Sequence, residues 1–267
     1  MCIRDRIYAY TPAPGQFVNA GPETIATPGQ ACEYAQRQMA GGGYVSLGAF
    51  GGYIVAGFDH SVDASADGYE LAVGGNSFDT SSEPGVVWVM QDENGDGLPN
   101  DTWYELRGSE YDDPATVHGY VVTYYRPASS GTEVPWTDDR GGRGAVGRNE
   151  FHQQDSYYPA WVAADSYTLR GTLLENRAEF GYSDRYGDFI WMLPARGWGY
   201  ADNYSDEGRD GTWNLFRISD AVRFDGSPAD LTYIDFVKVQ SGVQAMCGAI
   251  GETSTEVTGI ADYRMMK

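Results

Sequence analysis

The stretch TYIDFVKVQSG, residues 232–242, has the clearest strand pattern in the chain and decides the fold class. Apolar residues flank Asp235 on one phase of the alternation, and Val237 and Val239 flank Lys238 on the other. Because successive side chains of a strand point to opposite faces, the phase slips just before Val237. A β-bulge at that point, or a strand covered on both faces, would account for the slip. Both explanations place this segment within a sheet.

Strand-like segments recur at short spacing along most of the chain. Aromatic residues make up 14% of the sequence and there are 35 glycines, a mixture typical of strands joined by many turns. Besides 232–242, the segments are YVSLG (44–48), YIVAGF (53–58), YELAVG (69–74), GVVWVM (85–90), TWYELRG (102–108), GYVVTYY (119–125), SYTLRGTLL (166–174), DFIWML (188–193) and WNLFRIS (213–219). The Gly51-Gly52 pair between the first two predicts a hairpin. We therefore predict an all-β, jelly-roll-like β-sandwich with long rim loops and at most one or two short helices.

Three regions are expected along the chain. Residues 1–6, MCIRDR, look like the translated end of a sequencing adapter, so we expect them to be an artefact that replaces the native start and any signal peptide. Residues 7–43 are rich in proline and are expected to be irregular, apart from a short helix at 30–40 that three glycines end. Residues 44–264 are predicted to form a single sandwich domain, with a polar, glycine-rich excursion between strands at 128–165.

The chain is strongly acidic, with 18 Lys and Arg against 38 Asp and Glu and a formal net charge of −20. Such a surface repels phosphate backbones, which argues against nucleic acid as a partner, and it suits an extracellular protein that holds cations. No apolar run approaches the roughly 20 residues that a membrane helix needs, so no transmembrane segment is expected. Cys32 and Cys247 would either form a disulfide or remain separate thiols, and we predict separate thiols.

The stretch QDENGDGLPNDTWYEL, residues 91–106, has the ligand spacing of a calcium loop. Calcium takes six to eight oxygens, and an EF-hand loop supplies them from alternating positions around a sharp turn. The matching ligands here are Asp92, Asn94, Asp96 and the backbone carbonyl of Leu98. Trp103 stands where an EF-hand has its closing Glu, so the last ligand is left open between Asp101 and Glu105.

A metal-free loop is the alternative for the same stretch. Asn94-Gly95 and Asp96-Gly97 are strong turn dipeptides, and apolar strand segments flank the stretch, so a plain hairpin connection would fit. Without an ion, however, carboxylates about 4–5 Å apart repel one another by roughly 1 kcal/mol or more per pair. We therefore predict a bound Ca²⁺ whose role is structural.

No sequence pattern indicates catalysis. The chain has three histidines but no HExxH, no GxSxG and no Walker-type loop, so we predict no catalytic residues. Aromatic side chains beside Asp and Asn are typical of carbohydrate sites, and loop segments carry several. The predicted ligand-binding residues are Trp136, Asp138, Tyr158, Trp161, Trp198, Tyr200, Asp202 and Asn203. The alternative is that these rings only anchor long loops to the sandwich.

Several long segments resemble a family of cell-surface proteins of Bacteroidota, usually secreted or lipid-anchored and often described only as surface or PKD-associated proteins. The similar segments are YVSLGAFGGYIVAGFDHSV (44–62), GNSFDTSSEPGVVWVMQDENGDGLPNDTWYELRGSEY (75–111), VTYYRP (122–127), YIDFVKVQSGV (233–243) and GETSTEVTGIADY (251–263). The resemblance implies a jelly-roll-like sandwich outside the cell that captures a nutrient. Some relatives accompany outer-membrane uptake systems, including those for corrinoids, but the family supplies no catalytic motif.

Together these observations predict a non-catalytic, calcium-stabilised surface protein that binds a glycan or a corrinoid. An outer-membrane uptake transporter is the expected partner, as the resemblance implies. One alternative is a glycan-active hydrolase that uses an Asp/Glu pair in the rim loops, because such a pair leaves no sequence signature. The other is a structural or adhesive surface module.

Overall fold

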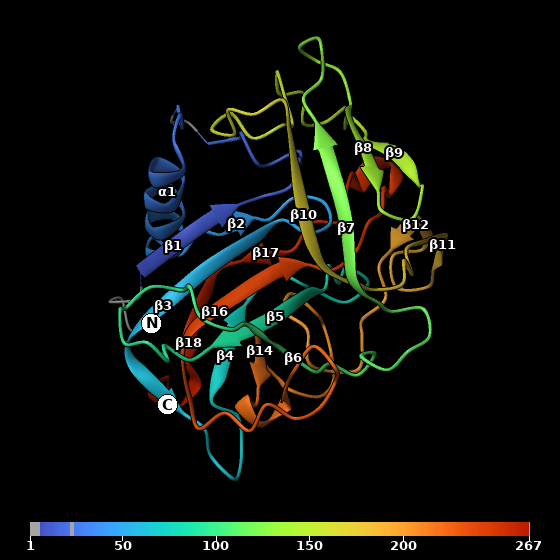
Figure 1. The fold of residues 1–267 in the computed structure, drawn as a ribbon. Coiled ribbons are helices and arrows are strands. Elements are labelled where there is room, and N and C mark those ends of the chain that lie inside the picture. Colours follow the sequence, from blue (N-terminus) through green and yellow to red (C-terminus); the bar gives the residue numbers. More distant parts are fainter. Residues whose placement is uncertain (1–5, 22–23, 267) are drawn as a thin grey trace.

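The computed structural model describes residues 6–21 and 24–266, and these are mostly β-strands (Figure 1). The central sheet has six strands in the order β1 (Arg6–Thr11), β3 (Tyr53–Asp63), β16 (Tyr233–Ser241), β5 (Gly85–Met90), β6 (Tyr104–Leu106) and β15 (Ala221–Val222). All of its pairings are antiparallel. The expected artefact at 1–6 falls largely outside the described residues, of which Arg6 is the first.

A second sheet packs on one face of the central sheet. Its order is β13 (Arg209–Asp210), β14 (Trp213–Phe216), β4 (Leu71–Gly74) and β18 (Gly259–Asp262). Val237 and Val239 of β16 meet Leu71 and Val73 of β4 in one continuous core, and all four are fully buried. The all-β, jelly-roll-like sandwich predicted from the sequence is therefore confirmed.

A third sheet stands beside the sandwich and extends upward in Figure 1. Its order is β10 (Ser166–Leu173), β7 (Val117–Tyr125), β8 (Val134–Asp138) and β9 (Arg143–Val146). Its apolar face packs on Phe50, Tyr157 and Tyr158 to form a separate core. Gln240 at the end of β16 joins the two sheets, since its side-chain amide donates to the carbonyls of Gly51 at 2.8 Å and Arg170 at 2.9 Å.

The remaining elements are short. Two-stranded pairs are formed by β11 (Glu179–Ser183) with β12 (Asp188–Met192) and by β2 (Val45–Ser46) with β17 (Glu256–Val257). The helix α1 (Pro28–Ala40) begins at a cap where the Thr27 hydroxyl accepts from the Gln30 amide, and it packs on β1 through Ala31 and Ala35. Single 3₁₀ turns lie at η1 (Ile218–Asp220), η2 (Gly248–Ile250) and η3 (Tyr263–Met265).

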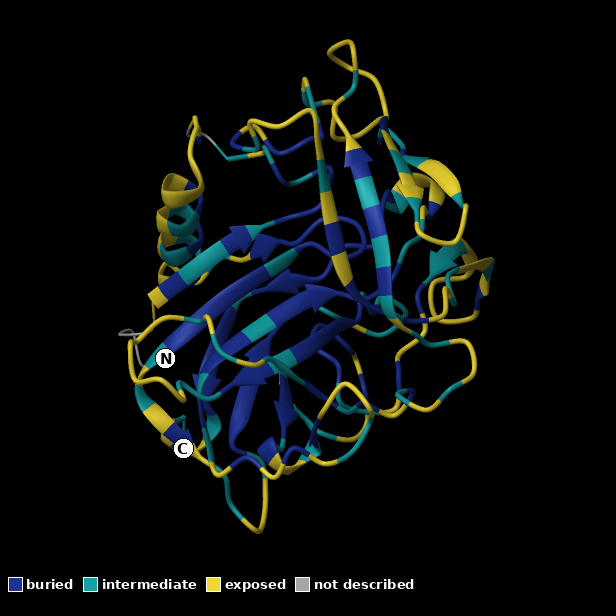
Figure 2. Cartoon of the chain, viewed as in Figure 1, coloured by how far each residue is buried: buried dark blue, intermediate teal, exposed yellow. Residues whose placement is uncertain are grey.

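Strand β16 shows both features that its sequence predicts. Its register against β3 shifts between Ile234 and Phe236, slightly before the predicted position. Both of its faces are also covered, because Val237 and Val239 are buried while Lys238 on the other face is half-buried. Figure 2 shows this burial across most of the central sheet. The phase slip therefore has two causes. The register of β16 against β3 is irregular, and each face of β16 is covered by a different part of the protein.

The predicted hairpin across Gly51-Gly52 is wrong. Strand β2 pairs with β17, whereas β3 pairs with β1 and β16. The Gly52 carbonyl accepts from the Ser241 amide at 2.9 Å, and a Cβ on Gly52 would lie 1.8 Å from the Leu47 carbonyl oxygen. The glycine pair therefore permits a close backbone crossing that leads into the central sheet.

Two regions predicted to be irregular contain strands. All of strand β1 except Arg6 lies within 7–43, and the strand pairs with β3; the predicted helix is also present there. The excursion at 128–165 contains β8 and β9, which form a hairpin with Val134 and Val146 buried in the second core. Proline and glycine within these short strands hide their alternation in the sequence.

Two smaller expectations can be compared with the described residues. Cys32 and Cys247 are both free thiols, as predicted. In the same part of the chain, no helix combines the length and the apolar character that crossing a membrane requires.

Replacing Ile54 by Ala tests the central sheet, because Ile54 is fully buried on β3 opposite Val239. We expect the variant to lose about 2–5 kcal/mol of unfolding free energy through lost burial and the cavity left behind. The measurement is urea denaturation. Leu98→Ala, at a side chain that is 48% exposed, is the control and should change stability by less than about 0.5 kcal/mol. Equal effects of the two substitutions would contradict the assigned core.

Candidate functional site

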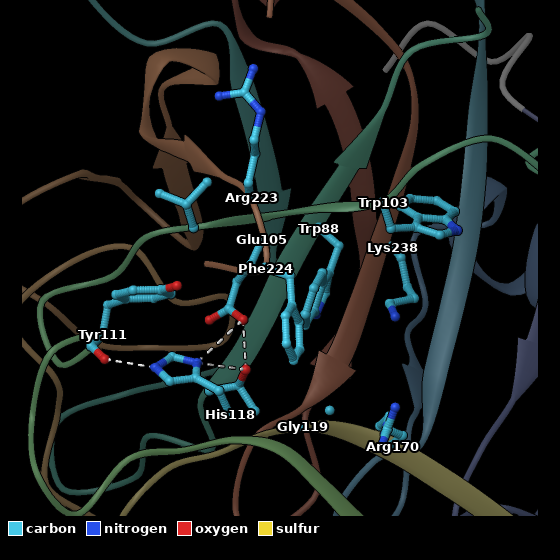
Figure 3. Close-up of a pocket in the computed structure, with 13 residues that line it drawn as sticks. Trp88, Trp103, Glu105, Tyr111, His118, Gly119, Arg170, Arg223, Phe224 and Lys238 are labelled. Atoms are coloured by element: carbon cyan, nitrogen blue, oxygen red, sulfur yellow. Dashed lines mark hydrogen bonds and ion pairs between the residues drawn. The ribbon is translucent and has the colours of Figure 1, made fainter. Parts of the chain in front are cut away.

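One row of paired residues crosses the face of the central sheet that points away from the main core. Lys238 of β16 pairs with Trp88 of β5, Trp88 pairs with Glu105 of β6, and Glu105 pairs with Val222 of β15. Paired residues on neighbouring strands point to the same face, so the four side chains lie side by side. They form the floor of a cavity of about 380 Å³ (Figure 3).

The walls of this cavity come from distant parts of the chain. Strands β7 and β10 and the segments around them contribute His118, Gly119, Arg170, Gly171 and Thr172, and the loops contribute Trp103, Tyr111, Arg223 and Phe224. Figure 3 shows Lys238 and Arg170 on one side, with His118 and Tyr111 on the other. Phe224 is 94% exposed, which is unusual for a large apolar ring and leaves it free to contact a ligand at the cavity mouth.

Aromatic rings surround the Lys238 ammonium. Its Nζ lies 4.6 Å from the ring centre of Trp88, 5.7 Å from Tyr53 and 5.8 Å from Trp103. Such rings attract a cation through their quadrupole, but they do not replace the hydrogen bonds of water. Burial accordingly lowers the pKa of Lys238 to about 8, and the charge of Glu105 opposes this shift.

Glu105 is held by two polar neighbours. The Thr172 hydroxyl donates to Glu105 Oε2 at 2.6 Å, and His118 Nδ1 lies 3.9 Å from the same oxygen. His118 Nε2 lies 2.9 Å from the Tyr111 carbonyl oxygen and donates its proton there. The interaction with Glu105 raises the pKa of His118. Glu105 therefore faces the cavity and is not available as the closing ligand of the acidic loop, which corrects that prediction.

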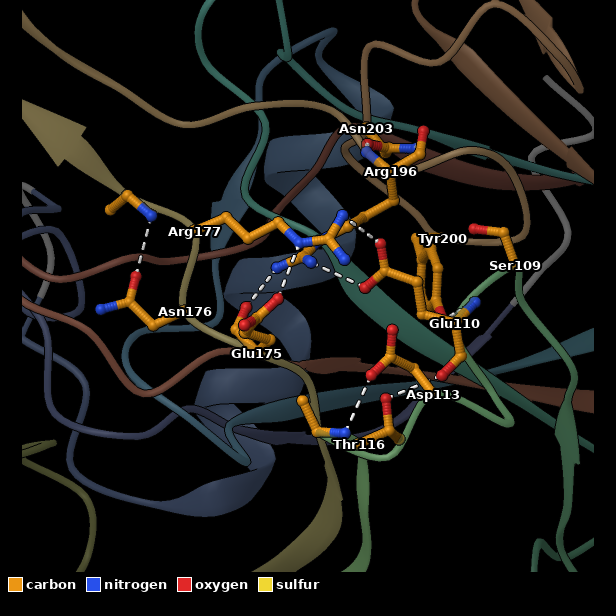
Figure 4. A network of polar contacts seen from close by, with 12 residues as sticks. Ser109, Glu110, Asp113, Thr116, Glu175, Asn176, Arg177, Arg196, Tyr200 and Asn203 are labelled. Atoms are coloured by element: carbon orange, nitrogen blue, oxygen red, sulfur yellow. Dashed lines mark hydrogen bonds and ion pairs between the residues drawn. The ribbon is translucent and has the colours of Figure 1, made fainter. Parts of the chain in front are cut away.

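A buried ionic network fixes the segment that carries Tyr111 (Figure 4). The Glu110 carboxylate contacts Arg177 Nη1 and Arg196 Nη1, each at 2.6 Å. The Glu110 amide also donates to the Tyr200 hydroxyl at 3.1 Å. A buried charge is stable only when it is paired, so the Glu110 carboxylate stays in contact with its arginines. These contacts hold the segment that carries Tyr111, and with it one wall of the cavity, in place.

The predicted ligand-binding aromatics do not assemble into a platform. Tyr158, Trp161 and Tyr200 are at most 5% exposed and belong to three different cores. Trp136 lies against Gly144 of the neighbouring strand, and Trp198 is half-buried. The three buried rings anchor segments to the cores, which is the alternative that the sequence left open.

The polar members of the predicted set are also engaged within the fold. Asp138 accepts from the Tyr120 hydroxyl and from the amide of Gly142 in the β8–β9 turn. Asn203 is fully buried, and its side-chain oxygen accepts from the Arg196 amide at 2.7 Å. Neither side chain lines the cavity described above.

Asp202 belongs to a buried carboxylate cluster. Oxygens of Asp202, Glu83 and Glu256 lie within 4.8 Å of one another. Asp202 Oδ1 accepts from the amides of Asn76 and Ser77, and its Oδ2 accepts from the Glu256 amide at 2.9 Å. Asp202 thus uses both oxygens within the fold.

Burial keeps protons on this cluster. It raises the pKa of Glu83 to about 8, with a further contribution from the charge of Asp202. It also raises the pKa of Asp202 to about 6, although amide hydrogen bonds oppose the shift. The pKa of Glu256 is raised well above its usual value by burial and by the charges of the other two carboxylates. Shared protons therefore offset repulsion between these groups.

The acidic loop between β5 and β6 closes on its own backbone amides. Asp92 accepts from the amides of Gly95 and Gly97 at 2.9 and 2.8 Å. Asp96 and Asp101 likewise accept backbone amides, at 2.9 and 3.0 Å. Within the described residues these carboxylates do not gather as a group of three within 4.8 Å, unlike the buried cluster.

Five of the six predicted calcium ligands nevertheless share this one loop. Asn94 Oδ1 accepts from the Asp96 amide at 2.9 Å, and the Leu98 carbonyl accepts from the Asn100 amide at 2.8 Å. These contacts are compatible with a tight metal-free turn. They also hold in position the side chains that would bind an ion. The loop ends at Trp103, so its conformation positions one wall of the cavity.

The sequence did not reveal the residues that form the cavity. Trp88, His118, Arg170 and Lys238 lie on four separate strands, and no local spacing relates them. One signal was present, because Lys238 interrupts an apolar strand in a chain that otherwise uses arginine almost exclusively for positive charge. An ionisable residue within an apolar strand indicates a site on the face of the strand that points away from the main core.

Comparison with known proteins identified no relative. No family model matches the chain, and no curated protein matches it.

Glu256→Gln tests whether the buried cluster holds protons. Between about pH 4.5 and 8 the unfolded chain loses protons that the folded cluster retains, so the unfolding free energy of the native protein falls as pH rises. Gln keeps a hydrogen-bond donor but does not ionise. The decrease in unfolding free energy between pH 5 and pH 8 should therefore be smaller in the variant, by about 1–3 kcal/mol. Urea denaturation at the two pH values measures this.

The two perturbed histidines need a control, because the raised pKa of His60 and of His118 also makes stability fall as pH rises. Glu256→Gln leaves them in place, so only the difference between variant and native protein reports on the cluster. Glu179→Gln, at an exposed position of β11, should retain the native pH dependence. Identical slopes for all three proteins would show that the cluster is ionised.

Proposed function

We propose that this protein binds a small glycan in the cavity floored by Lys238, Trp88 and Glu105. The observation that carries this proposal is the combination of aromatic faces and placed polar groups in one concave site. Sugar rings stack their C–H faces on aromatic side chains while hydroxyls take hydrogen bonds from nearby polar groups. Glu105, Thr172 and Arg170 supply such groups beside the rings.

The size of the cavity favours a glycan over a corrinoid. A volume of about 380 Å³ lies near the lower end of the range for small-molecule pockets, roughly 300–1,000 Å³. It can take one or two sugar rings, whereas a corrin macrocycle with its nucleotide is too large to be enclosed. A corrinoid would therefore have to lie largely outside this cavity.

The lining of the cavity supports binding in preference to hydrolysis. Glycoside hydrolases use two carboxyl groups about 5–10 Å apart, one on each side of the scissile bond. Among the described residues that line the cavity, Glu105 is the single carboxylate. It also accepts from Thr172 and lies beside His118, so we propose a non-catalytic role.

We place this binding function outside the cell, at the outer-membrane surface, with an uptake transporter as the partner. The resemblance of residues 44–62 and 75–111 to Bacteroidota surface proteins supports this placement, as does the net charge of −20. In such a setting the cavity would hold a nutrient sugar for transfer.

We propose further that the acidic loop binds Ca²⁺ and thereby fixes the cavity. The loop joins β5 to β6, the two strands that supply Trp88 and Glu105, and it leads directly into Trp103. Asp92, Asn94 and Asp96 with the Leu98 carbonyl and Asp101 would supply the oxygens. The ion would take no part in chemistry.

Trp103→Ala tests the glycan site. A mono- and oligosaccharide panel screened by thermal shift should contain sugars that raise the melting temperature of the native protein, because a ligand that binds only the folded state stabilises it. Loss of one stacking face should weaken their affinity by at least about tenfold. Trp136→Ala, outside the cavity, should bind as the native protein does. A panel without any stabilising sugar would remove this function.

Calcium removal tests the loop. We expect EDTA to lower the melting temperature, and excess Ca²⁺ at about 100 times its dissociation constant to add roughly 2.7 kcal/mol of unfolding free energy. Asp96→Asn should abolish this response, whereas Asp206→Asn, an exposed acid outside the loop, should retain it. A melting temperature that is the same with EDTA and with Ca²⁺ would show that the loop is a metal-free turn.

A further inference from the structure

We propose that the glycan bound in this cavity is acidic, with a carboxylate or sulfate substituent held between the Lys238 ammonium and the Arg170 guanidinium. This inference rests on the proposed function, because it names the class of sugar that the same cavity takes. It depends on three properties of the cavity: its charge, the absence of internal partners for its cations, and the presence of lysine at one position.

The charge of the cavity is opposite to that of the protein. The chain has a formal net charge of −20, yet Lys238, Arg170 and Arg223 line the cavity together with a single acid, Glu105. His118 adds further positive charge when it is protonated, and its pKa is raised. A concave site of one charge sign concentrates ligands of the other sign. Within an acidic protein, such a site selects anions.

The cations of the cavity have no acidic partner. Among the described residues, none forms an ion pair or hydrogen bond with the Lys238 ammonium or the Arg170 guanidinium. Arg223 donates only to backbone carbonyls, including that of Ala229 at 3.1 Å. Several other arginines of the fold do pair with carboxylates, such as Arg107 with Asp112 at 2.9 Å. The charges left over in the cavity are therefore available to a ligand.

The one carboxylate in the cavity forms no ion pair with Lys238, Arg170 or Arg223 among the described residues. Glu105 Oε2 accepts from Thr172 and faces His118, on the side away from Arg170. Figure 3 shows the Trp88 and Phe224 side chains between this carboxylate and Lys238, and it shows the Lys238 and Arg170 side chains on the far side of these rings. An anionic substituent between Lys238 and Arg170 would contact both cations, while its ring could stack on Trp88 or Trp103.

Lysine is a rare residue in this chain. Of the 18 basic residues only Lys238 and Lys267 are lysines. A lysine ammonium is a compact charge that loses its proton readily when buried, whereas arginine stays charged. The pKa of Lys238, about 8 because of burial, implies that a bound anion would favour the charged form and that deprotonation would weaken anion binding.

Other ionisable groups line the same cavity or lie beside this amine, on the elements packed around it. They are Tyr53 on β3, Glu105 on β6, His118 on β7, Arg170 on β10, Tyr111 in the loop before β7, and Arg223 after β15. Of these groups, His118 is the one whose charge also changes near neutral pH. A test must therefore separate Lys238 from His118.

Calorimetric titration with D-glucuronate, D-glucose 6-sulfate and D-glucose tests the inference at pH 7. The native protein should bind one or both acidic sugars at least about tenfold more tightly than glucose, since hydrogen bonds to charged groups are worth more than neutral ones. Lys238→Met and Arg170→Gln should each remove most of this preference. Arg143→Gln, at an exposed strand position outside the cavity, should keep it. Unchanged melting temperatures would show that the variants are folded.

The pH dependence gives a second readout specific to lysine. Affinity for the acidic sugar should fall by about tenfold between pH 7 and pH 9 in the native protein, as Lys238 loses its proton. Lys238→Arg should bind at pH 7 and keep its affinity at pH 9, and any fall that remains would belong to His118. Affinity in the native protein that is equal at both pH values would contradict the role of Lys238.

The outcomes separate this inference from the function on which it rests. Equal binding of glucose and of both acidic sugars, with loss in Trp103→Ala, would overturn the acidic class and leave glycan binding standing. Binding of inorganic sulfate as tight as that of the sugars would show an anion site without sugar recognition and would also overturn the inference. Failure of every sugar would remove both proposals together.

Discussion

The alternation of side chains along β16 is the constraint on which the rest of this structure depends. Val237 and Val239 must point into the main core, since they are fully buried there, and the pleat then forces Lys238 to the opposite face. A shift of one residue would place the lysine in the core and expose the valines. Pairing on both sides, with β3 and β5, keeps β16 in its register.

The candidate site follows from that register. Once Lys238 faces outward, antiparallel pairing brings Trp88, Glu105 and Val222 alongside it across four strands. The third sheet covers part of this face and leaves the cavity where its strands end. The site is therefore built mainly on strands, which hold side chains more rigidly than loops, while Phe224 at the mouth is exposed and free to adapt.

Buried polar groups elsewhere are satisfied in different ways. Glu110 forms ion pairs with two arginines. Among the described residues, no ion pair joins Glu83, Asp202 or Glu256 to a cation, and burial keeps protons on the cluster instead. The acidic loop uses a third solution, because backbone amides surround its carboxylates. These groups tie together segments far apart in the sequence, and Glu110 and the loop border the cavity.

The sequence by itself determined the local structure: most strands, the short helix at 30–40, the tight turns of the acidic loop and the all-β class. It did so because alternation, capping and turn residues act between near neighbours. Tertiary structure alone decided which strands pair, that Tyr158, Trp161 and Tyr200 are buried, and that Glu105 leaves the acidic loop for the cavity. A sequence pattern cannot show whether an aromatic ring is buried or exposed. It also cannot show whether a lysine on the outer face of a strand has an ionic partner. Those properties depend on contacts between segments that are far apart in the chain, and only the folded register brings them together.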